Sequence, residues 1–331
     1  MKLPARLAAT AVVALALAAC SGTGDDGGDA GTGSAPAAGG DFPATVETAF
    51  GDITVDEAPE RVVALGWGDA ETALALGVQP VGASDWLGFG GDGVGPWSDG
   101  LYDESPEIIE TLEPSYEQVA ALEPDLILDV KSSGDQERHD RLSQIAPTVG
   151  IPAGGENYLT STEQQTTMIA DALGVPDEGA ALLDKRDQAF AEAAEAHPEW
   201  DGMTATAATR TSEGWGAYIE GSERVEFLER LGFQQSPTID GLKAGATGFS
   251  VDISDEQLDL LDADLIVAFP IFIDKAEITD DPQWQAIPAV EKGHDVVIDG
   301  DLQSAYSLGT AESQIYAVDE LTGLIEDALG S

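Results

Sequence analysis

Two stretches of the chain repeat one pattern. The first reads Ser115-Tyr-Glu-Gln-Val-Ala-Ala-Leu-Glu-Pro-Asp-Leu-Ile-Leu128, and it aligns without gaps with Ser254-Asp-Glu-Gln-Leu-Asp-Leu-Leu-Asp-Ala-Asp-Leu-Ile-Val267. In each copy Ser stands three positions before Gln, the spacing of a capping box at the start of a helix. Each copy ends in an apolar run typical of a strand that is covered on both faces. The repeat therefore predicts two similar lobes, each with a short helix that leads into a buried strand.

The flanking segments extend this prediction. Residues 61–65 and 205–209 read as strands, and each is followed by a helical stretch that ends at Gly77 or Gly232. Strands that alternate with helices are typical of parallel α/β sheets. Between the halves, residues 160–173 and 177–197 read as helices, the second about 20 residues and roughly 30 Å long. We expect an α/β fold of two similar lobes, each a mostly parallel sheet flanked by helices, joined by one long rigid helix: an N-terminal lobe at 43–158, an interlobe helical segment at 159–199 and a C-terminal lobe at 200–331.

The N-terminus has the layout of a secretory signal. Lys2 and Arg6 precede an apolar run at 7–19, which is too short for a comfortable membrane span. The small residues before Cys20 resemble a bacterial lipobox, and Cys20 is the only cysteine of the chain. We expect a lipoprotein signal peptide at 1–19, lipidation of Cys20, and a flexible Gly- and Asp-rich tether at 20–42. The protein would then lie outside the cytoplasm, anchored to the outer face of the bacterial cell membrane; the alternative is an ordinary signal peptide with a chance cysteine.

Composition and motifs exclude several function classes. The chain has 62 acidic and 14 basic residues, a formal net charge of −48, so it lacks the basic surface that nucleic-acid binding requires. It contains no nucleophile elbow and no phosphate-binding glycine loop. Its three histidines, His139, His197 and His294, lack metal-ligand spacing. We therefore expect a binding protein without enzyme activity, cofactor or protein-bound metal, and keep a secreted carboxylate-dependent hydrolase as an alternative.

Candidate ligand contacts follow from strand ends. In parallel α/β units, ligands bind beyond the carboxyl ends of the strands, so two facing lobes would form an interlobe cleft there. Aromatic and basic residues lie in the segments that follow the predicted strands: Trp67, Trp86, Lys131, Arg210, Trp215, Tyr218, Phe272 and Tyr306. Trp215 and Tyr218 are expected in a loop after the strand at 205–209. The alternative is that the aromatic residues cover core edges and that Lys131 and Arg210 neutralise nearby acids.

Together these features resemble a known family, the substrate-binding proteins of ABC importers that have a single rigid interlobe helix. Its members bind ferric siderophores, haem or vitamin B12. The resemblance covers about residues 44–330 and is carried by Ala58-Pro-Glu-Arg-Val-Val-Ala-Leu65, by the Leu-Gly-Val-Gln-Pro-Val-Gly run that ends at Gly82, and by the two Glu-Gln repeats. It implies that Glu117 and Glu256, one per lobe, dock onto arginines of the two permease subunits. The simpler interpretation is that each acid stabilises its helix dipole.

The resemblance also implies the ligand class. Most of the family that keeps the Ala-Pro-Glu-Arg-Val-Val opening handles ferric siderophores, with the iron held inside the chelator. Aromatic side chains with Lys131 and Arg210 suit an anionic ferric chelate, because arginine binds oxyanions and stacks on rings. We expect a monomer that captures such a chelate, delivers it to an ABC permease dimer and meets the membrane only through its lipid anchor. A haem or cobalamin receptor of the same fold and a surface adhesin are the alternatives.

Overall fold

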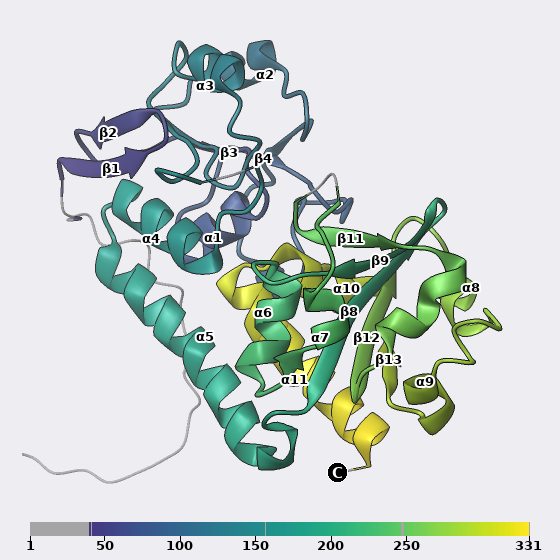
Figure 1. Ribbon diagram of the computed structural model, residues 1–331. Helices are drawn as coiled ribbons and strands as arrows, with labels where there is room; N and C mark the ends of the chain where they lie inside the picture. The colour runs from purple at the N-terminus through teal and green to yellow at the C-terminus, as the bar shows by residue number, and fades with distance from the viewer. Residues whose placement is uncertain (1–39, 41, 156, 246–247, 331) are drawn as a thin grey trace, which may run out of the picture. The chain divides into compact units, whose positions relative to one another are not determined.

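The computed structural model describes residue 40 and residues 42–155, 157–245 and 248–330 (Figure 1). The predicted signal peptide at 1–19, the lipidated Cys20 and nearly all of the tether at 20–42 lie outside these residues, so those three expectations stay predictions. Residues 36–331 form one compact unit.

The N-terminal lobe contains a five-stranded parallel sheet in the order β5-β4-β3-β6-β7. All residues of β3, β4 and β6 are buried, because core side chains cover both faces of the sheet. An antiparallel hairpin precedes it, β1 (Ala44–Thr48) with β2 (Gly51–Val55). The other elements of this lobe are β3 (Val62–Ala64), α1 (Asp69–Ala75), β4 (Gly82–Ser84), the 3₁₀ helix η1 (Pro96–Ser98), β5 (Glu107–Ile109), α2 (Tyr116–Ala121), β6 (Leu126–Leu128), α3 (Gln136–Leu142) and β7 (Thr148–Val149).

Two helices join the lobes. Helix α4 (Thr162–Ala172) begins with a complete capping box between Ser161 and Gln164. Helix α5 (Pro176–Ala196) begins with proline in its first turn, where the missing N–H costs no helical hydrogen bond. Figure 1 shows α5 running from the N-terminal lobe to the far end of the C-terminal lobe. The long connecting helix predicted at 177–197 is therefore confirmed.

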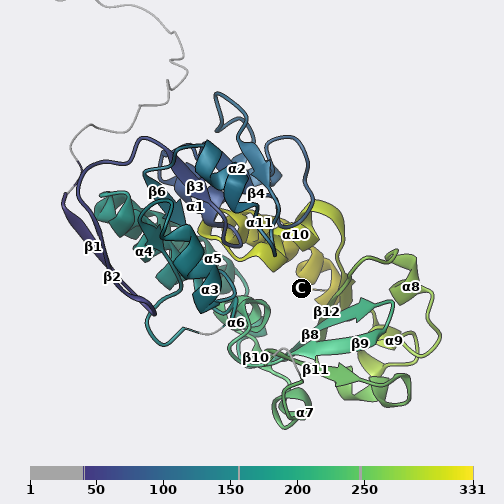
Figure 2. The ribbon, with the colours of Figure 1, turned by 90° about the horizontal axis from the view of Figure 1, so that it is seen from above.

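The C-terminal lobe contains a six-stranded mixed sheet in the order β11-β9-β8-β12-β13, with β10 beside β8. Its β8–β10, β8–β12 and β12–β13 pairs are parallel. The β8–β9 and β9–β11 pairs are antiparallel (Figure 2). The elements are the 3₁₀ helix η2 (Pro198–Trp200), β8 (Thr204–Thr211), β9 (Gly214–Tyr218), α6 (Glu223–Arg230), β10 (Gln234–Gln235), α7 (Pro237–Asp240), β11 (Ser250–Ile253), the 3₁₀ helix η3 (Asp255–Leu261), β12 (Leu265–Pro270), α8 (Ala276–Thr279), α9 (Pro288–Lys292), β13 (Asp295–Val297), α10 (Gly300–Leu308) and α11 (Ala311–Leu329).

The lobes share parts of their cores. Large side chains such as Trp200, Phe227 and Phe269 fill one face of the C-terminal sheet, and Trp215 and Trp284 belong to the cluster on the other. The C-terminal helix α11 returns to the other lobe, since its first residue, Ala311, belongs to the N-terminal core. The expected α/β architecture of two helix-flanked sheets with one long connecting helix is confirmed.

Two local expectations need correction. Trp215 and Tyr218 lie in strand β9, not in a loop, because Ser212 and Glu213 form a tight turn that pairs β9 with β8. The two copies of the repeat also differ: the first forms an α-helix, whereas the second forms the 3₁₀ helix η3, with non-helical φ and ψ at Gln257.

Candidate ligand-binding site

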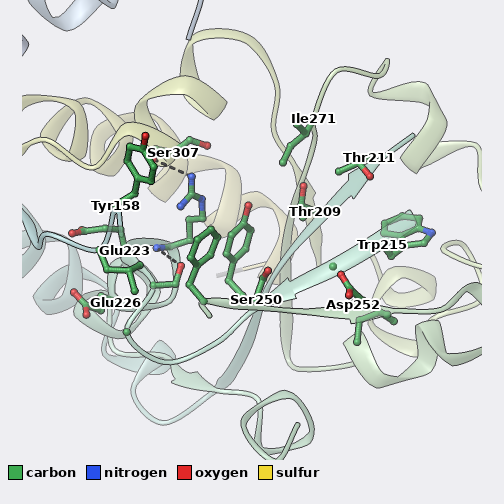
Figure 3. Close-up of a pocket in the computed structure, with 18 of the residues that line it drawn as sticks. Tyr158, Thr209, Thr211, Trp215, Glu223, Glu226, Ser250, Asp252, Ile271 and Ser307 are labelled. Atoms are coloured by element: carbon green, nitrogen blue, oxygen red, sulfur yellow. Dashed lines mark hydrogen bonds between the residues drawn. The ribbon is translucent and has the colours of Figure 1, made fainter. Parts of the chain in front are cut away.

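Residues of both lobes line one cavity of about 860 Å³. The N-terminal side contributes Trp67, Lys131 and the segment 158–161. The C-terminal side contributes residues of β8, β9 and β11 and the start of α6 (Figure 3). The volume lies in the range of sites that bury drug-sized molecules.

Hydrogen bonds fix the two loops that carry Trp67 and Lys131. These loops follow the neighbouring strands β3 and β6, and the Trp67 N–H donates to the Lys131 carbonyl at 2.8 Å. The buried carboxylate of Asp69 accepts from the Val130 N–H at 2.8 Å and from Nε2 of Gln165 at 2.7 Å. The same Nε2 donates to the Trp67 carbonyl at 2.8 Å. Burial raises the pKa of Asp69 to about 6, although its hydrogen bonds from Gln165 and Val130 oppose this shift.

Lys131 and Glu223 face each other across the lobes. The Lys131 side chain is buried, and its Nζ lies 3.8 Å from Oε1 of Glu223. Burial lowers the pKa of Lys131, and the nearby carboxylate of Glu223 opposes that shift. Glu223 is itself held in place: its carboxylate accepts from the Thr162 N–H at 3.1 Å and from Nε2 of Gln314 at 2.9 Å. Glu223 therefore connects α6 to α4 and α11 beside the cavity.

Arg224 is a cavity residue that the sequence analysis did not identify. Its guanidinium carbon lies 4.7 Å from the centre of the Tyr218 ring, and Nη2 donates to the Ser307 carbonyl at 3.1 Å. A sequence signal existed, because Arg224 occupies the first turn of α6, where the helix dipole disfavours a cation. A cation in an unfavourable helix position is a candidate for function.

Several donor atoms of the lining lack a hydrogen-bond partner. Within the described residues this holds for the buried atoms Nε1 of Trp67, Nε1 of Trp215, Nζ of Lys131 and Nε of Arg224. A buried donor that stays unpaired costs about 1–3 kcal/mol. Acceptor atoms of a ligand would reduce this cost.

Aromatic rings form much of the remaining wall. Trp86 packs against Trp67 at 5.5 Å and edge-on against Tyr158 at 5.4 Å between ring centres, and its Nε1 donates to the Leu65 carbonyl. Trp86 therefore supports two lining rings from behind. In the other lobe Tyr218 stacks on Phe249, which also lines the cavity. Tyr158 and Phe249 lie in irregular segments that the strand-end rule did not select.

The predicted contact residues divide into two groups. Four line the cavity: Trp67, Lys131, Trp215 and Tyr218. The other four lie outside the lining. Trp86 packs behind Trp67, and Arg210 pairs with Asp281 and lies over the Trp215 ring. Tyr306 of helix α10 is buried in the core, where its hydroxyl donates to the Arg224 carbonyl, and Phe272 is fully exposed beside the lining residue Ile271. Their roles in binding stay predictions.

The predicted docking residues Glu117 and Glu256 are both exposed, one on α2 and one on η3. Among the described residues no group of three His, Cys, Asp or Glu side chains is arranged to hold a metal ion. Within the same part of the chain, no helix combines the length and apolar character of a membrane span.

A family comparison agrees with this architecture. The sequence model described as "Periplasmic binding protein" matches residues 62–302. The chain belongs to this family. This periplasmic binding protein is a substrate-binding protein and not an enzyme, as its lack of catalytic motifs suggested.

Individual relatives are similar over most of their length. The probable siderophore-binding lipoprotein YfiY of Bacillus subtilis is 27% identical over 266 residues, 76% of this chain and 78% of the relative. The Fe(3+) dicitrate-binding periplasmic protein FecB of Escherichia coli is 26% identical over 264 residues, 76% of this chain and 80% of the relative. A periplasmic solute binding protein from Mycobacterium smegmatis has a crystal structure with a TM-score of 0.78 and 28% identity, covering 87% of this chain and 99% of that one. PiaA of Streptococcus pneumoniae, in complex with ferrichrome, has a TM-score of 0.73 and 25% identity, with 87% and 99% covered.

Proposed function

We propose that this periplasmic binding protein captures a ferric siderophore in the cavity between its lobes and delivers it to an ABC permease. The observation that carries the proposal is the lining itself. A cavity of about 860 Å³ combines aromatic rings with the side chains of Lys131 and Arg224. Ferric siderophores present oxygen atoms around the iron and apolar backbone segments between them, so donors and rings together suit this class.

The relatives support iron chelates over haem and cobalamin. YfiY is named a probable siderophore-binding protein, FecB a ferric dicitrate-binding protein, and PiaA was crystallised with ferrichrome. Their ligands differ in charge, so the charge class needs its own argument. The preference for an anionic chelate expected from the sequence relied on Lys131 and Arg210, and Arg210 is paired with Asp281 outside the lining.

The same proposal includes location and partner. Relatives named lipoproteins and periplasmic proteins both act outside the cytoplasm, which supports an extracytoplasmic role for this chain. The sequence before residue 40 supports a lipid anchor at Cys20. The exposed Glu117 and Glu256, one on each lobe, would contact the two permease subunits.

Tryptophan fluorescence tests the proposal, because Trp67 lines the cavity. The purified protein is titrated with ferrichrome, ferrioxamine B, ferric enterobactin, ferric citrate, haemin and cyanocobalamin. We expect saturable quenching by at least one iron chelate. Arg224→Gln should weaken that chelate by more than about tenfold, or ~1.4 kcal/mol. The exposed Arg141, which lies over Tyr116, gives the control variant Arg141→Gln.

The titration has two contrary results. Quenching by haemin or cyanocobalamin alone would retain the receptor role and replace the ligand. No response to any compound would overturn the proposed function. Equal losses of affinity in the Arg224 and Arg141 variants would show that Arg224 does not contact the chelate.

A further inference from the structure

The charged side chains of the cavity are mainly acidic. Within the described residues the lining contains two cations, Lys131 and Arg224. It contains four carboxylates, which gives a formal charge of −2: Glu213, Glu223, Glu226 and Asp252. Figure 3 shows Glu223 and Glu226 at one end and Asp252 beside Trp215 at the other, so acids flank the cavity on both sides.

Changes in protonation leave the net charge of the lining negative. Burial lowers the pKa of Lys131, and loss of its proton would make the lining more acidic. Burial, together with the nearby Glu223, raises the pKa of Glu226. A protonated Glu226 still leaves three carboxylates against two cations. The lining is therefore negative in each of these states.

Differences in solvent exposure strengthen the excess of negative charge in the lining. Glu213 and Asp252 are exposed, whereas Lys131 is buried and already has the Glu223 carboxylate 3.8 Å from its Nζ. An anionic group that approached Lys131 would also approach Glu223, whose position is fixed by Thr162 and Gln314. The whole chain has a formal charge of −48, so its long-range field repels anions as well.

We infer that the ligand is a neutral or cationic ferric hydroxamate, and that the acidic lining excludes highly anionic chelates. This inference rests on the proposed function and replaces the anionic preference expected from the sequence. In a tris-hydroxamate the three ligand charges balance the ferric ion, and its carbonyl oxygens can accept hydrogen bonds from Lys131 and Arg224. A protonated amine tail would be attracted by Glu226 and Asp252. Repulsion of the wrong charge is a common source of specificity.

Competition among chelates of different charge tests the inference. Dissociation constants are measured for cationic ferrioxamine B, neutral ferrichrome and anionic ferric enterobactin and ferric citrate. We expect the best hydroxamate to bind at least about tenfold more tightly than either anion. The double variant Glu226→Gln/Asp252→Asn should reduce the ratio of the anion's dissociation constant to the hydroxamate's at least about threefold, because it removes two carboxylates from the lining. Glu137→Gln/Asp327→Asn, with both residues exposed and outside the lining, gives a control with the same change in net charge.

The outcomes separate the two proposals. The inference is overturned if an anionic chelate binds most tightly, or if the lining and control variants change the ratio equally. The receptor function still holds in both cases. Absence of binding by every iron chelate would instead overturn the proposed function on which the inference rests.

Discussion

At the scale of single residues, the buried carboxyl group of Glu71 contacts a loop of the N-terminal lobe. Glu71 lies in α1, and its Oε1 accepts a hydrogen bond from the Gly95 N–H at 3.2 Å. Burial raises the pKa of Glu71 to about 8. Close to Gly95 in the loop, Trp97 packs against Tyr316 of α11 with 5.6 Å between ring centres. The same segment therefore contacts a buried titratable group and a helix of the other lobe.

Glu71 makes the protein less stable as the pH rises. The folded state keeps a proton that the unfolded chain releases near its ordinary pKa of 4.5, so stability falls with rising pH until about pH 8 is passed. Glu71→Gln keeps an acceptor for Gly95 and cannot ionise. We expect this variant to raise Tm only slightly near about pH 5 and markedly near about pH 9, because the wild-type protein loses stability between the two pKa values of Glu71. Thermal unfolding of both proteins at the two pH values measures this, and an equal shift at both would contradict the assignment.

The strand-end rule found part of the site for a physical reason. Trp67 and Lys131 follow adjacent parallel strands, so sequence order alone places them at one sheet edge. Arg210 ends the same kind of strand, yet its charge is taken up by Asp281, which is 71 residues away and invisible to local sequence. Arg224, by contrast, lines the cavity from the first turn of helix α6. The pairing of Arg210 with a distant carboxylate is a feature that residue type and local order do not reveal, and Arg210 lies outside the cavity lining.

At the scale of elements, α5 is held to its neighbours by an ion-pair network. Arg186 of α5 is almost fully buried and pairs with Glu163 of α4 and with Asp187. Arg230 of α6 pairs with the same two carboxylates. The network joins the connecting helix α5 to α4 and α6.

Arg186 and Lys185 provide a matched test on one helix. Arg186→Ala removes a buried side chain and three charged hydrogen bonds to two carboxylates, so we expect a loss of about 2–3 kcal/mol in the free energy of unfolding. Lys185 is 60% exposed and pairs only with Glu312 in the described structure. Lys185→Ala should cost no more than about 0.5 kcal/mol. Urea unfolding measures both, and similar losses in the two variants would show that burial of the network contributes little.

The sequence predicted secondary structure correctly where the hydrophobic pattern was strong. It missed strand β9, in which glycine residues interrupt that pattern. The uninterrupted helical stretch at 177–197 and the apolar strand ends of the repeat are found almost as predicted. Strand β9 has the sequence Gly-Trp-Gly-Ala-Tyr, whose glycines are typical of loops. It forms a strand because it pairs with β8 on one side and β11 on the other. Strand β8 is the adjacent strand of a tight hairpin, whereas β11 is a partner more than 30 residues away in sequence, which the local pattern of β9 does not reveal.

At the scale of the whole molecule, the repeat places one exposed glutamate on each lobe. Glu117 lies on a regular α-helix capped by Ser115, whereas Glu256 lies on the irregular η3. Ser254 and Gln257, which flank Glu256, line the cavity, but no residue of α2 does. The two proposed docking surfaces thus differ: only the C-terminal one borders the cavity.

This arrangement yields a prediction for transport. Glu117→Ala/Glu256→Ala should abolish uptake of the iron chelate in cells while the purified variant binds it within about twofold of wild type, because neither side chain lines the cavity. Glu137→Ala/Glu277→Ala removes the same charges from other exposed positions, one on each lobe, and should transport normally. Uptake of radioactive iron and fluorescence titration together measure the two effects. If binding fell as far as uptake, or if the control pair lost uptake equally, the two glutamates would not form a specific contact with a two-subunit permease.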